Sequence, residues 1–246
     1  MTQKSSDALL RDAPFSVAPD GMLRREDFTR ERIDWLRERG KEIGQDWVLS
    51  HEERDASRTE AIRNLTPGEP VWVFGYGSLM WNPAIHVAAT ERAQVFGYHR
   101  SFCLNLIFGR GSPDYPGLML ALDTGGSCVG LAHKIAPEHV ESELDILWMR
   151  EMTLGSYKPV WLTARFAEGP RTVLTFAANK AHERYVGPQP FGAAAQRIAI
   201  SDGYVGDNRT YLYNTVRHLD ELGIKDGSLH KLEHAVRRIA GEASPQ

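Results

Sequence analysis

The feature that most constrains the fold is the segment 71–80, which reads VWVFGYGSLM. Its first half is β-branched and aromatic, as is typical of a largely buried strand. Gly75 and Gly77 then let the chain turn tightly and leave the backbone N–H groups that follow unobstructed. Successive N–H groups in such a turn form a concave anion site. The segment therefore predicts a buried strand that ends either in an ordinary loop or in a backbone-lined binding site.

The composition excludes several classes of protein. Of the 246 residues, 42% are hydrophobic and 25% are charged, and the net charge is -3 with the basic residues scattered along the chain. We therefore expect a globular protein without a nucleic-acid partner and without affinity for an anionic membrane surface. The sequence has neither an apolar signal segment at its start nor a stretch of about 20 apolar residues, so we expect a cytoplasmic protein with no membrane span.

The thiol and imidazole groups do not form a metal-binding pattern. Cys103 and Cys128 are too few for a disulfide framework and lack the spacing of a zinc site. Cys103 lies in an apolar run, where a small buried side chain is favoured over a nucleophile. His230 and His234 are one helical turn apart, but no further ligand accompanies them, which favours a solvated helix face. The sequence thus predicts no metal site.

The chain divides into a polar extension, residues 1–70, and a main domain, residues 71–246. Within the extension, residues 24–39 and 52–65 are charge-dense and predict two modest helices that pack on the main domain. A cluster of threonine, proline and glycine precedes the first strand and places the domain boundary near Pro70.

In the main domain, apolar runs in the middle of the chain predict strands, and helical patterns flank them. Strands are expected at residues 94–98, 99–108, 118–122, 128–135, 158–166 and 171–177. A glycine pair at 125–126 predicts a hairpin turn, a proline at 137 predicts a helix that ends close to Glu151, and the region from residue 190 onward is helical in pattern. The expected class is α+β, with a small mixed, barrel-like β-sheet and peripheral helices.

One acidic residue is out of place in this pattern. Glu151 follows the apolar end of the predicted helix and precedes an apolar and aromatic stretch, which can desolvate a carboxylate and adapt it to base catalysis. A surface position or a salt bridge is the alternative interpretation of Glu151, and Arg150 is able to pair with a group nearby. Ser78 is not the nucleophile of a G-x-S-x-G elbow, because Tyr76 and Met80 occupy the positions of its two glycines.

Two motifs resemble a known family. Residues 73–79, VFGYGSL, resemble the signature loop of the ChaC-like gamma-glutamylcyclotransferases, and Arg150-Glu151 resembles the segment that carries their catalytic glutamate. Residues 116–122, 185–188 and 208–214 match the family in the same order, so the resemblance runs from residue 71 to the C-terminal helix. The spacing between Glu151 and Tyr157 is that of the bacterial form rather than the animal form, which leaves the role of Tyr157 open. The first 70 residues lie outside the resemblance.

The resemblance implies an enzyme that cleaves glutathione to 5-oxoproline and Cys-Gly without a metal or an organic cofactor. In such an enzyme Glu151 would be the general acid and base, and the loop would bind the α-carboxylate of the substrate. The substrate-binding residues implied are Val73, Phe74, Gly75, Tyr76, Gly77, Ser78 and Leu79. Two alternatives stay open. The protein is either a cyclotransferase that acts on other γ-glutamyl peptides or amines, or a non-catalytic metabolite-binding regulator linked to cation transport.

Recognition of the Cys-Gly half of glutathione is less determined by the sequence. Specificity depends on the pocket groups that contact this half, and the candidates are Arg110, Tyr115 and Arg209. The side chain of Tyr76 is expected to pack in the core or to form a pocket wall, since a tyrosine at the end of a buried strand is usually structural.

Overall fold

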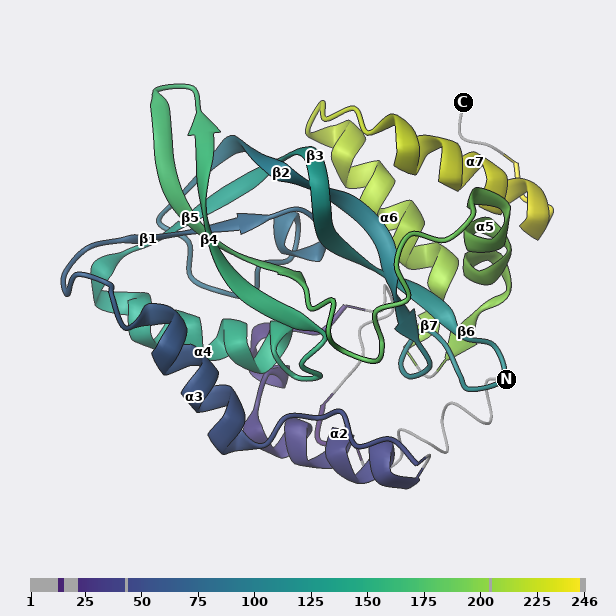
Figure 1. The fold of residues 1–246 in the computed structure, drawn as a ribbon, viewed down its shortest axis with the longest axis horizontal. Helices are drawn as coiled ribbons and strands as arrows, with labels where there is room; N and C mark the ends of the chain where they lie inside the picture. The colour runs from purple at the N-terminus through teal and green to yellow at the C-terminus, as the bar shows by residue number, and fades with distance from the viewer. Residues whose placement is uncertain (1–12, 16–21, 43, 204, 244–246) are drawn as a thin grey trace. The chain divides into compact units, whose positions relative to one another are not determined.

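The computed structural model describes residues 13–15, 22–42, 44–203 and 205–243 (Figure 1). Its central element is a closed β-barrel in the strand order β1-β3-β2-β4-β5. The strands are β1 (Val71–Gly75), β2 (Ala89–Leu106), β3 (Gly117–Ile135), β4 (Tyr157–Phe166) and β5 (Gly169–Ala178). β1 runs antiparallel to β3 and parallel to β5, and β4 and β5 form an antiparallel pair. The barrel and the helices outside it confirm the predicted α+β class.

The helical elements precede, interrupt and follow the strands. They are η1 (Arg25–Asp27), α2 (Arg30–Glu42), α3 (His51–Ile62), η2 (Ser78–Met80), η3 (Pro137–His139), α4 (Val140–Glu151), α5 (Phe191–Ile200), α6 (Asn208–Glu221) and α7 (Gly227–Ala240). A short two-stranded sheet, β6 (Asp202–Gly203) with β7 (Gly206–Asp207), lies between α5 and α6 in the sequence. The expected helical character beyond residue 190 is thereby confirmed.

The described residues form two compact units. One consists of residues 13–100 and 122–182, and the other of residues 101–121 and 183–243. The described part of the N-terminal extension belongs to the first unit, together with β1, β4, β5 and α4. The boundary near Pro70 stays a sequence prediction.

The predicted hairpin at residues 125–126 is wrong, because β3 continues through the glycine pair. Gly125 and Gly126 adopt positive φ values of 106° and 69° inside the strand, and the segment predicted as two strands, 94–108, is likewise one strand with Gly97 at a φ of 79°. Long, strongly coiled barrel strands need such local irregularities, and glycine supplies them. A glycine pair therefore marks a bend here and not a chain reversal.

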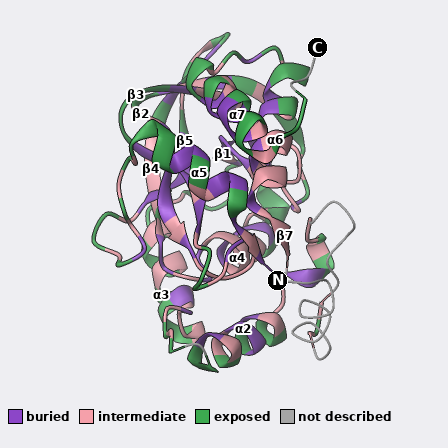
Figure 2. Ribbon diagram, turned by 90° about the vertical axis from the view of Figure 1, so that its right-hand side faces the viewer, coloured by how far each residue is buried: buried purple, intermediate pink, exposed green. Residues whose placement is uncertain are grey.

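The two helices of the extension begin at different residues than the charge pattern predicts. α2 starts at Arg30, and the hydroxyl of the preceding Thr29 accepts a hydrogen bond from the N–H of Arg32. Residues 25–27 form a separate 3-10 turn. α3 starts at His51 with a capping box in which Ser50 and Glu53 satisfy each other's backbone N–H groups. Each helix presents both buried and exposed residues along its length (Figure 2).

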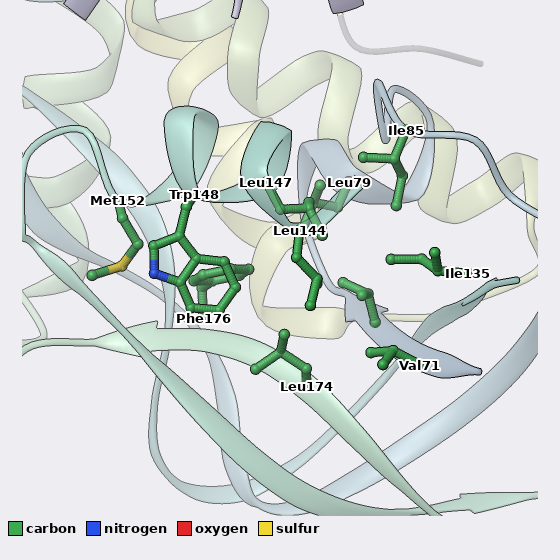
Figure 3. Packing of buried hydrophobic residues seen from close by; sticks show 11 residues of the cluster. Val71, Leu79, Ile85, Ile135, Leu144, Leu147, Trp148, Met152, Leu174 and Phe176 are labelled. Carbon is green, nitrogen blue, oxygen red and sulfur yellow. The ribbon is translucent and has the colours of Figure 1, made fainter. Parts of the chain in front are cut away.

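An apolar cluster in the first unit draws side chains from β1, η2, β3, α4 and β5 (Figure 3). Trp148 of α4 packs edge-on against Phe176 of β5, with ring centroids 5.2 Å apart. Leu79 of η2 and Leu147 of α4 enter the same cluster, so the loop after β1 and the C-terminal half of α4 are held against one core.

In the second unit, Asn208 at the start of α6 ties the helices to the beginning of β3. Its side chain accepts the N–H of Leu118 at 2.8 Å and donates to the Leu118 carbonyl at 3.0 Å. Arg197 of α5 donates to the carbonyls of Pro116 and Gly117. Side chains of α5 and α6 thus satisfy the backbone where β3 begins.

Candidate active site

The loop between β1 and η2 is fixed through its carbonyl groups. The Tyr76 carbonyl accepts a hydrogen bond of 2.6 Å from Nε of Arg100, a residue of β2, and the Leu79 carbonyl lies 2.8 Å from Nε2 of His133, a residue of β3. Arg100 and His133 are both buried. Side chains of two barrel strands thus fix these carbonyl groups of the segment from Gly75 to Met80, which we call the glycine loop.

The N–H groups of the same loop are left open. Within the described residues, the backbone N–H groups of Gly77, Ser78 and Leu79 have no hydrogen-bond partner. The close turn requires a glycine at position 75, where a Cβ atom would lie 2.9 Å from Cβ of Leu79. Neighbouring N–H groups without partners are suited to bind an anion such as a carboxylate.

Arg150 connects this loop to Glu151. Its Nε donates to Oε1 of Glu151 at 2.8 Å, and its Nη2 donates to Oγ of Ser78 at 2.8 Å. A third hydrogen bond, from Nη1, reaches the carbonyl of Asn82 just beyond η2. The guanidinium group therefore spans the gap between the two sequence motifs, and it brings the glycine loop and the glutamate into one site.

Glu151 is a poorly solvated carboxylate at the C-terminal end of α4. Its side chain is only 14% exposed. Burial raises the pKa of Glu151 above the ordinary glutamate value of 4.5, and the adjacent Arg150 opposes this only in part. A raised pKa makes the carboxylate a stronger base, as suits a group that takes and returns a proton.

His133 supports the loop as a neutral imidazole. Burial lowers its pKa, and Arg150 acts in the same direction, while the hydrogen bond to the Leu79 carbonyl opposes both. With its hydrogen on Nε2, the ring donates to Leu79 and can accept at Nδ1 from the Thr90 hydroxyl, 3.0 Å away. The neutral ring satisfies both neighbours without placing a second positive charge beside Arg150.

The structure brings together part of the set that the sequence predicted. Ser78 is linked to Glu151 through Arg150, as described above, whereas the side chains of Val73 and Phe74 are completely buried. The Tyr76 side chain is also buried, and its hydroxyl donates to the carbonyl of Phe176 at 2.8 Å. For these three residues the barrel fixes the side chains in the core.

Sequence reasoning missed several polar residues around the site. Arg100 and His133 lie in apolar strand patterns, and a charged or aromatic polar residue in such a run is a signal for a buried structural role. Arg25 and Glu143 form a two-pronged ion pair, with Nη2 to Oε1 at 2.8 Å, beside the loop that follows η2. They are 118 residues apart, and no local pattern connects them.

The remaining candidates lie elsewhere in the structure, and their role in recognising the Cys-Gly half stays a prediction. Arg110 and Arg209 belong to the second unit, where Arg110 donates to the Asp207 carbonyl and Arg209 pairs with Asp207 and Glu242. Tyr115 is 54% exposed. His230 lies in the first turn of α7, where its ring contacts the Asp226 carbonyl and the Asp220 carboxylate.

No cluster of three or more histidine, cysteine, aspartate or glutamate side chains is placed to hold a metal ion in the part of the chain that the structure describes. Across the same residues, no helix has the length and apolarity needed to cross a lipid bilayer. Cys103 is completely buried, and Cys128 is nearly so.

Comparison with known proteins agrees with the fold and the motifs. A glutathione-specific gamma-glutamyl cyclotransferase from yeast superposes with a TM-score of 0.62 over 69% of this chain and 96% of its own, at 22% identity. The barrel is therefore of the gamma-glutamylcyclotransferase type. The family model of ChaC-like proteins matches residues 71–239. The chain belongs to the ChaC-like family.

Sequence relatives extend this result. The glutathione-specific gamma-glutamylcyclotransferase of Escherichia coli is 38% identical over 205 residues, which cover 82% of this chain and 88% of the relative. Gamma-glutamylcyclotransferase 2-3 of Arabidopsis thaliana is 33% identical over 70% of this chain and 92% of its own length. The match with the bacterial relative is longer than the part of the chain beyond residue 70, so it includes residues of the N-terminal extension.

Proposed function

We propose that the chain is a glutathione-specific gamma-glutamylcyclotransferase, which converts glutathione to 5-oxoproline and Cys-Gly in the cytoplasm. The observation that carries the proposal is the bridge of Arg150 between Ser78 in the glycine loop and the buried carboxylate of Glu151. The relatives at 38% and 33% identity bear names of this activity and support the same conclusion.

The loop is suited to hold the α-carboxylate of the γ-glutamyl group. The N–H groups of Gly77, Ser78 and Leu79 provide neighbouring donors, and the Arg150 guanidinium adds positive charge beside them. Because Ser78 Oγ accepts a hydrogen bond from Arg150, its own hydrogen is available to the substrate carboxylate. Anchoring at this end leaves the α-ammonium and the γ-carbonyl free to approach each other.

Glu151 then supplies the proton transfers. Its carboxylate takes a proton from the α-ammonium group, and the resulting amine attacks the γ-carbonyl carbon of the same substrate molecule. The bond from that carbon to the cysteine nitrogen breaks, and protonated Glu151 gives its proton to the leaving nitrogen. The carboxylate then takes the second proton from the ring nitrogen, which leaves the neutral lactam of 5-oxoproline, and it passes this proton to the released amine. Because the nucleophile is already tethered, much of the entropic barrier is absent, and neither a metal nor an organic cofactor is needed.

Replacement of Glu151 tests the mechanism. We expect Glu151→Gln to lower kcat by about 1,000-fold, within the range for loss of a general acid and base. The wild-type kcat/KM should also fall at acidic pH with a midpoint above 4.5, because the pKa of Glu151 is raised by burial. Release of 5-oxoproline from glutathione, measured across pH, checks both results. An active Glu151→Gln enzyme would refute the assigned mechanism.

Loss of activity must be separated from loss of folding. A raised pKa means that ionised Glu151 destabilises the folded state at neutral pH relative to its protonated form. Glu151→Gln is therefore expected to retain or raise Tm, which thermal unfolding at pH 7 would show. A lower Tm would indicate that the amide disturbs Arg150, and the kinetic result would then not report on chemistry alone.

Substrate breadth is decided by a panel of γ-glutamyl compounds. We expect turnover of glutathione and at least tenfold lower kcat/KM for γ-glutamyl-alanine and γ-glutamyl-lysine, which lack the Cys-Gly half. Equal turnover of all three would favour a general cyclotransferase. Binding without turnover of any of them would favour a metabolite-binding regulator.

A further inference from the structure

The segment before α2 contacts the groups that hold Arg150 in place. The carbonyl of Leu23 accepts a hydrogen bond of 2.9 Å from Nδ2 of Asn82, and the carbonyl of the same Asn82 accepts one from Nη1 of Arg150. The ring of Phe28 lies under the Arg150 guanidinium, 5.5 Å from ring centroid to Cζ. Residues 23–28, which we call the positioning segment, thus meet Arg150 directly and through Asn82.

Arg25 fixes the loop between Asn82 and β2. It donates to the carbonyl of Ala84, a residue that adopts a left-handed backbone with a φ of 56°, and it forms the two-pronged pair with Glu143. The carboxylate of Glu143, 1% exposed, also accepts the N–H of His86 at 2.9 Å. A left-handed alanine costs about 1–2 kcal/mol, so these contacts stabilise a loop shape that the chain would not adopt by itself.

The extension also holds the chain just after Glu151. The N–H of Leu49 donates to the Thr153 carbonyl at 3.0 Å, and a Cβ atom at Gly155 would lie 3.2 Å from Cδ2 of Leu49. Glu151 therefore lies between two points at which the extension contacts the chain, Phe28 over Arg150 on one side and Leu49 at Thr153 on the other. Glu151 is the last residue of α4, so the helix supports its backbone on one side only, and the chain that follows also determines where the carboxylate lies.

We propose that the positioning segment, residues 23–28, is part of the active site, because it sets where Arg150 lies against Glu151 and Ser78. Its residues do not meet substrate, and they act as positioning residues rather than catalytic ones. The inference rests on the proposed function for its kinetic test, whereas its titration test does not require an active enzyme. Glu151 pairs with Arg150, and Arg150 also contacts the Ser78 hydroxyl and acts on His133, while the Thr153 hydroxyl donates to the backbone carbonyl of Arg150. The segment therefore influences Glu151 through the guanidinium of Arg150.

The first test replaces Phe28 by leucine in the full-length protein. Leucine retains most of the apolar contact but removes the ring face on which the guanidinium lies. We expect Phe28→Leu to lower kcat about threefold to fivefold while KM stays within twofold, because substrate anchoring by the loop is retained. Arg25→Gln should lower kcat about tenfold, and Arg25→Lys should recover part of that loss because it restores the charge opposite Glu143.

A matched control comes from the same extension. Arg63 pairs with Glu60 at 2.7 Å on the surface of α3, where both side chains are more than half exposed. Arg63→Gln removes one arginine charge without touching Arg150, and we expect kcat and KM to stay within 1.5-fold of wild type. If Arg25→Gln fails to fold, the double variant Arg25→Gln/Glu143→Gln removes both charges and retains amide hydrogen bonding, and the same loss of kcat is expected.

A second readout does not depend on catalysis. The ¹³Cδ signals of isotopically labelled glutamate report the titration of Glu151, with Glu151→Gln identifying the signal. We expect its midpoint to rise by about half a pH unit or more in Phe28→Leu and Arg25→Gln, because a displaced Arg150 no longer favours the ionised form. A lower Tm with unchanged kcat and an unchanged or lowered titration midpoint would overturn the proposal.

The two readouts separate the inference from the function. If the wild-type protein releases no 5-oxoproline from any substrate, the proposed function fails, and the titration of Glu151 still decides whether the segment positions Arg150. If the wild type is active and both Phe28→Leu and Arg25→Gln leave kcat and the titration unchanged, the function stands and the positioning role is refuted.

Discussion

The glycine loop and the end of α4 provide the two halves of the site, and they are supported in different ways. The loop is bound by the barrel itself, through Arg100 at the Tyr76 carbonyl and His133 at the Leu79 carbonyl. The end of α4 is bound by the N-terminal extension, through contacts at Arg150 and Thr153. The proposed anchor is thus held by the barrel, whereas the proposed acid–base group adjoins a segment outside the family model.

This difference predicts which kinetic constant each half controls. Changes beneath the loop should disturb binding of the substrate carboxylate and appear mainly in KM. Changes in the extension should disturb the position of Glu151 and appear mainly in kcat. Variants of the loop therefore test the expected effect on KM, whereas variants of the positioning segment test the expected effect on kcat.

Among the variants of the loop and its supports, the largest effect is expected from Gly75→Ala. A Cβ atom at this position would lie 2.9 Å from Cβ of Leu79 and 3.2 Å from the backbone nitrogen of Met80, so the turn must shift. We expect kcat/KM for glutathione to fall about 100-fold, chiefly through KM, because displaced N–H groups no longer converge on one carboxylate. Steady-state kinetics of 5-oxoproline release measures this.

The control for that variant is Gly192→Ala in α5, where a Cβ atom meets nothing within 4 Å. It introduces the same methyl group without a clash, and wild-type kinetics are expected. If Gly75→Ala keeps its KM while kcat falls, the loop acts on the chemical step, and the division between the two halves is wrong.

A smaller effect is expected from His133→Gln, which replaces the imidazole beneath the loop. The pKa of His133 is lowered in the folded protein, so its contribution to stability is complete above the unfolded value of 6.5 and is lost as pH falls from there toward the folded value. Wild-type Tm should therefore decrease from pH 7.5 to 5.5 more steeply than that of the variant. Parallel curves would show that His133 does not titrate differently in the two states.

His133→Gln should also raise KM about tenfold with little change in kcat. A glutamine can still donate to the Leu79 carbonyl, but it lacks the second contact, at Thr90, that orients the ring. Loss of an oriented hydrogen bond under the loop is worth about 1 kcal/mol, and the displaced N–H groups account for the remaining loss.

The sequence predicted the strand and the glycine turn at residues 71–80 better than the elements that surround them. The run at 71–75 is followed by a tight glycine turn, and because both are local properties, the strand, the loop and the barrel class could be anticipated. The predicted hairpin at 125–126 failed because pairing of β3 with β1, from Val71 opposite Ile135 to Gly75 opposite Leu131, is decided by distant residues. The positive φ values that glycine allows at residues 125 and 126 are compatible with a hairpin turn or with a bend inside a strand.

The supports of Glu151 could not be predicted for a similar reason. Glu143 lies at the start of a helix, where an acidic residue is expected to face solvent and the helix dipole, yet it is buried against Arg25. The pKa of Glu143 is lowered because Arg25 and the His86 N–H outweigh the effect of burial. Such pairs follow from how the extension packs on the barrel, which charge patterns do not encode.

The smallest effect is expected from Ser78→Ala, which removes the one side chain of the loop that touches Arg150. The guanidinium keeps its hydrogen bonds to Asn82 and Glu151, so Glu151 should stay in place and kcat should remain within twofold. The lost hydroxyl donor should raise KM about fivefold, as expected for a hydrogen bond worth about 1 kcal/mol. A fall in kcat at constant KM would mean instead that Ser78 serves Arg150 rather than the substrate, and that the loop and the end of α4 act as one unit.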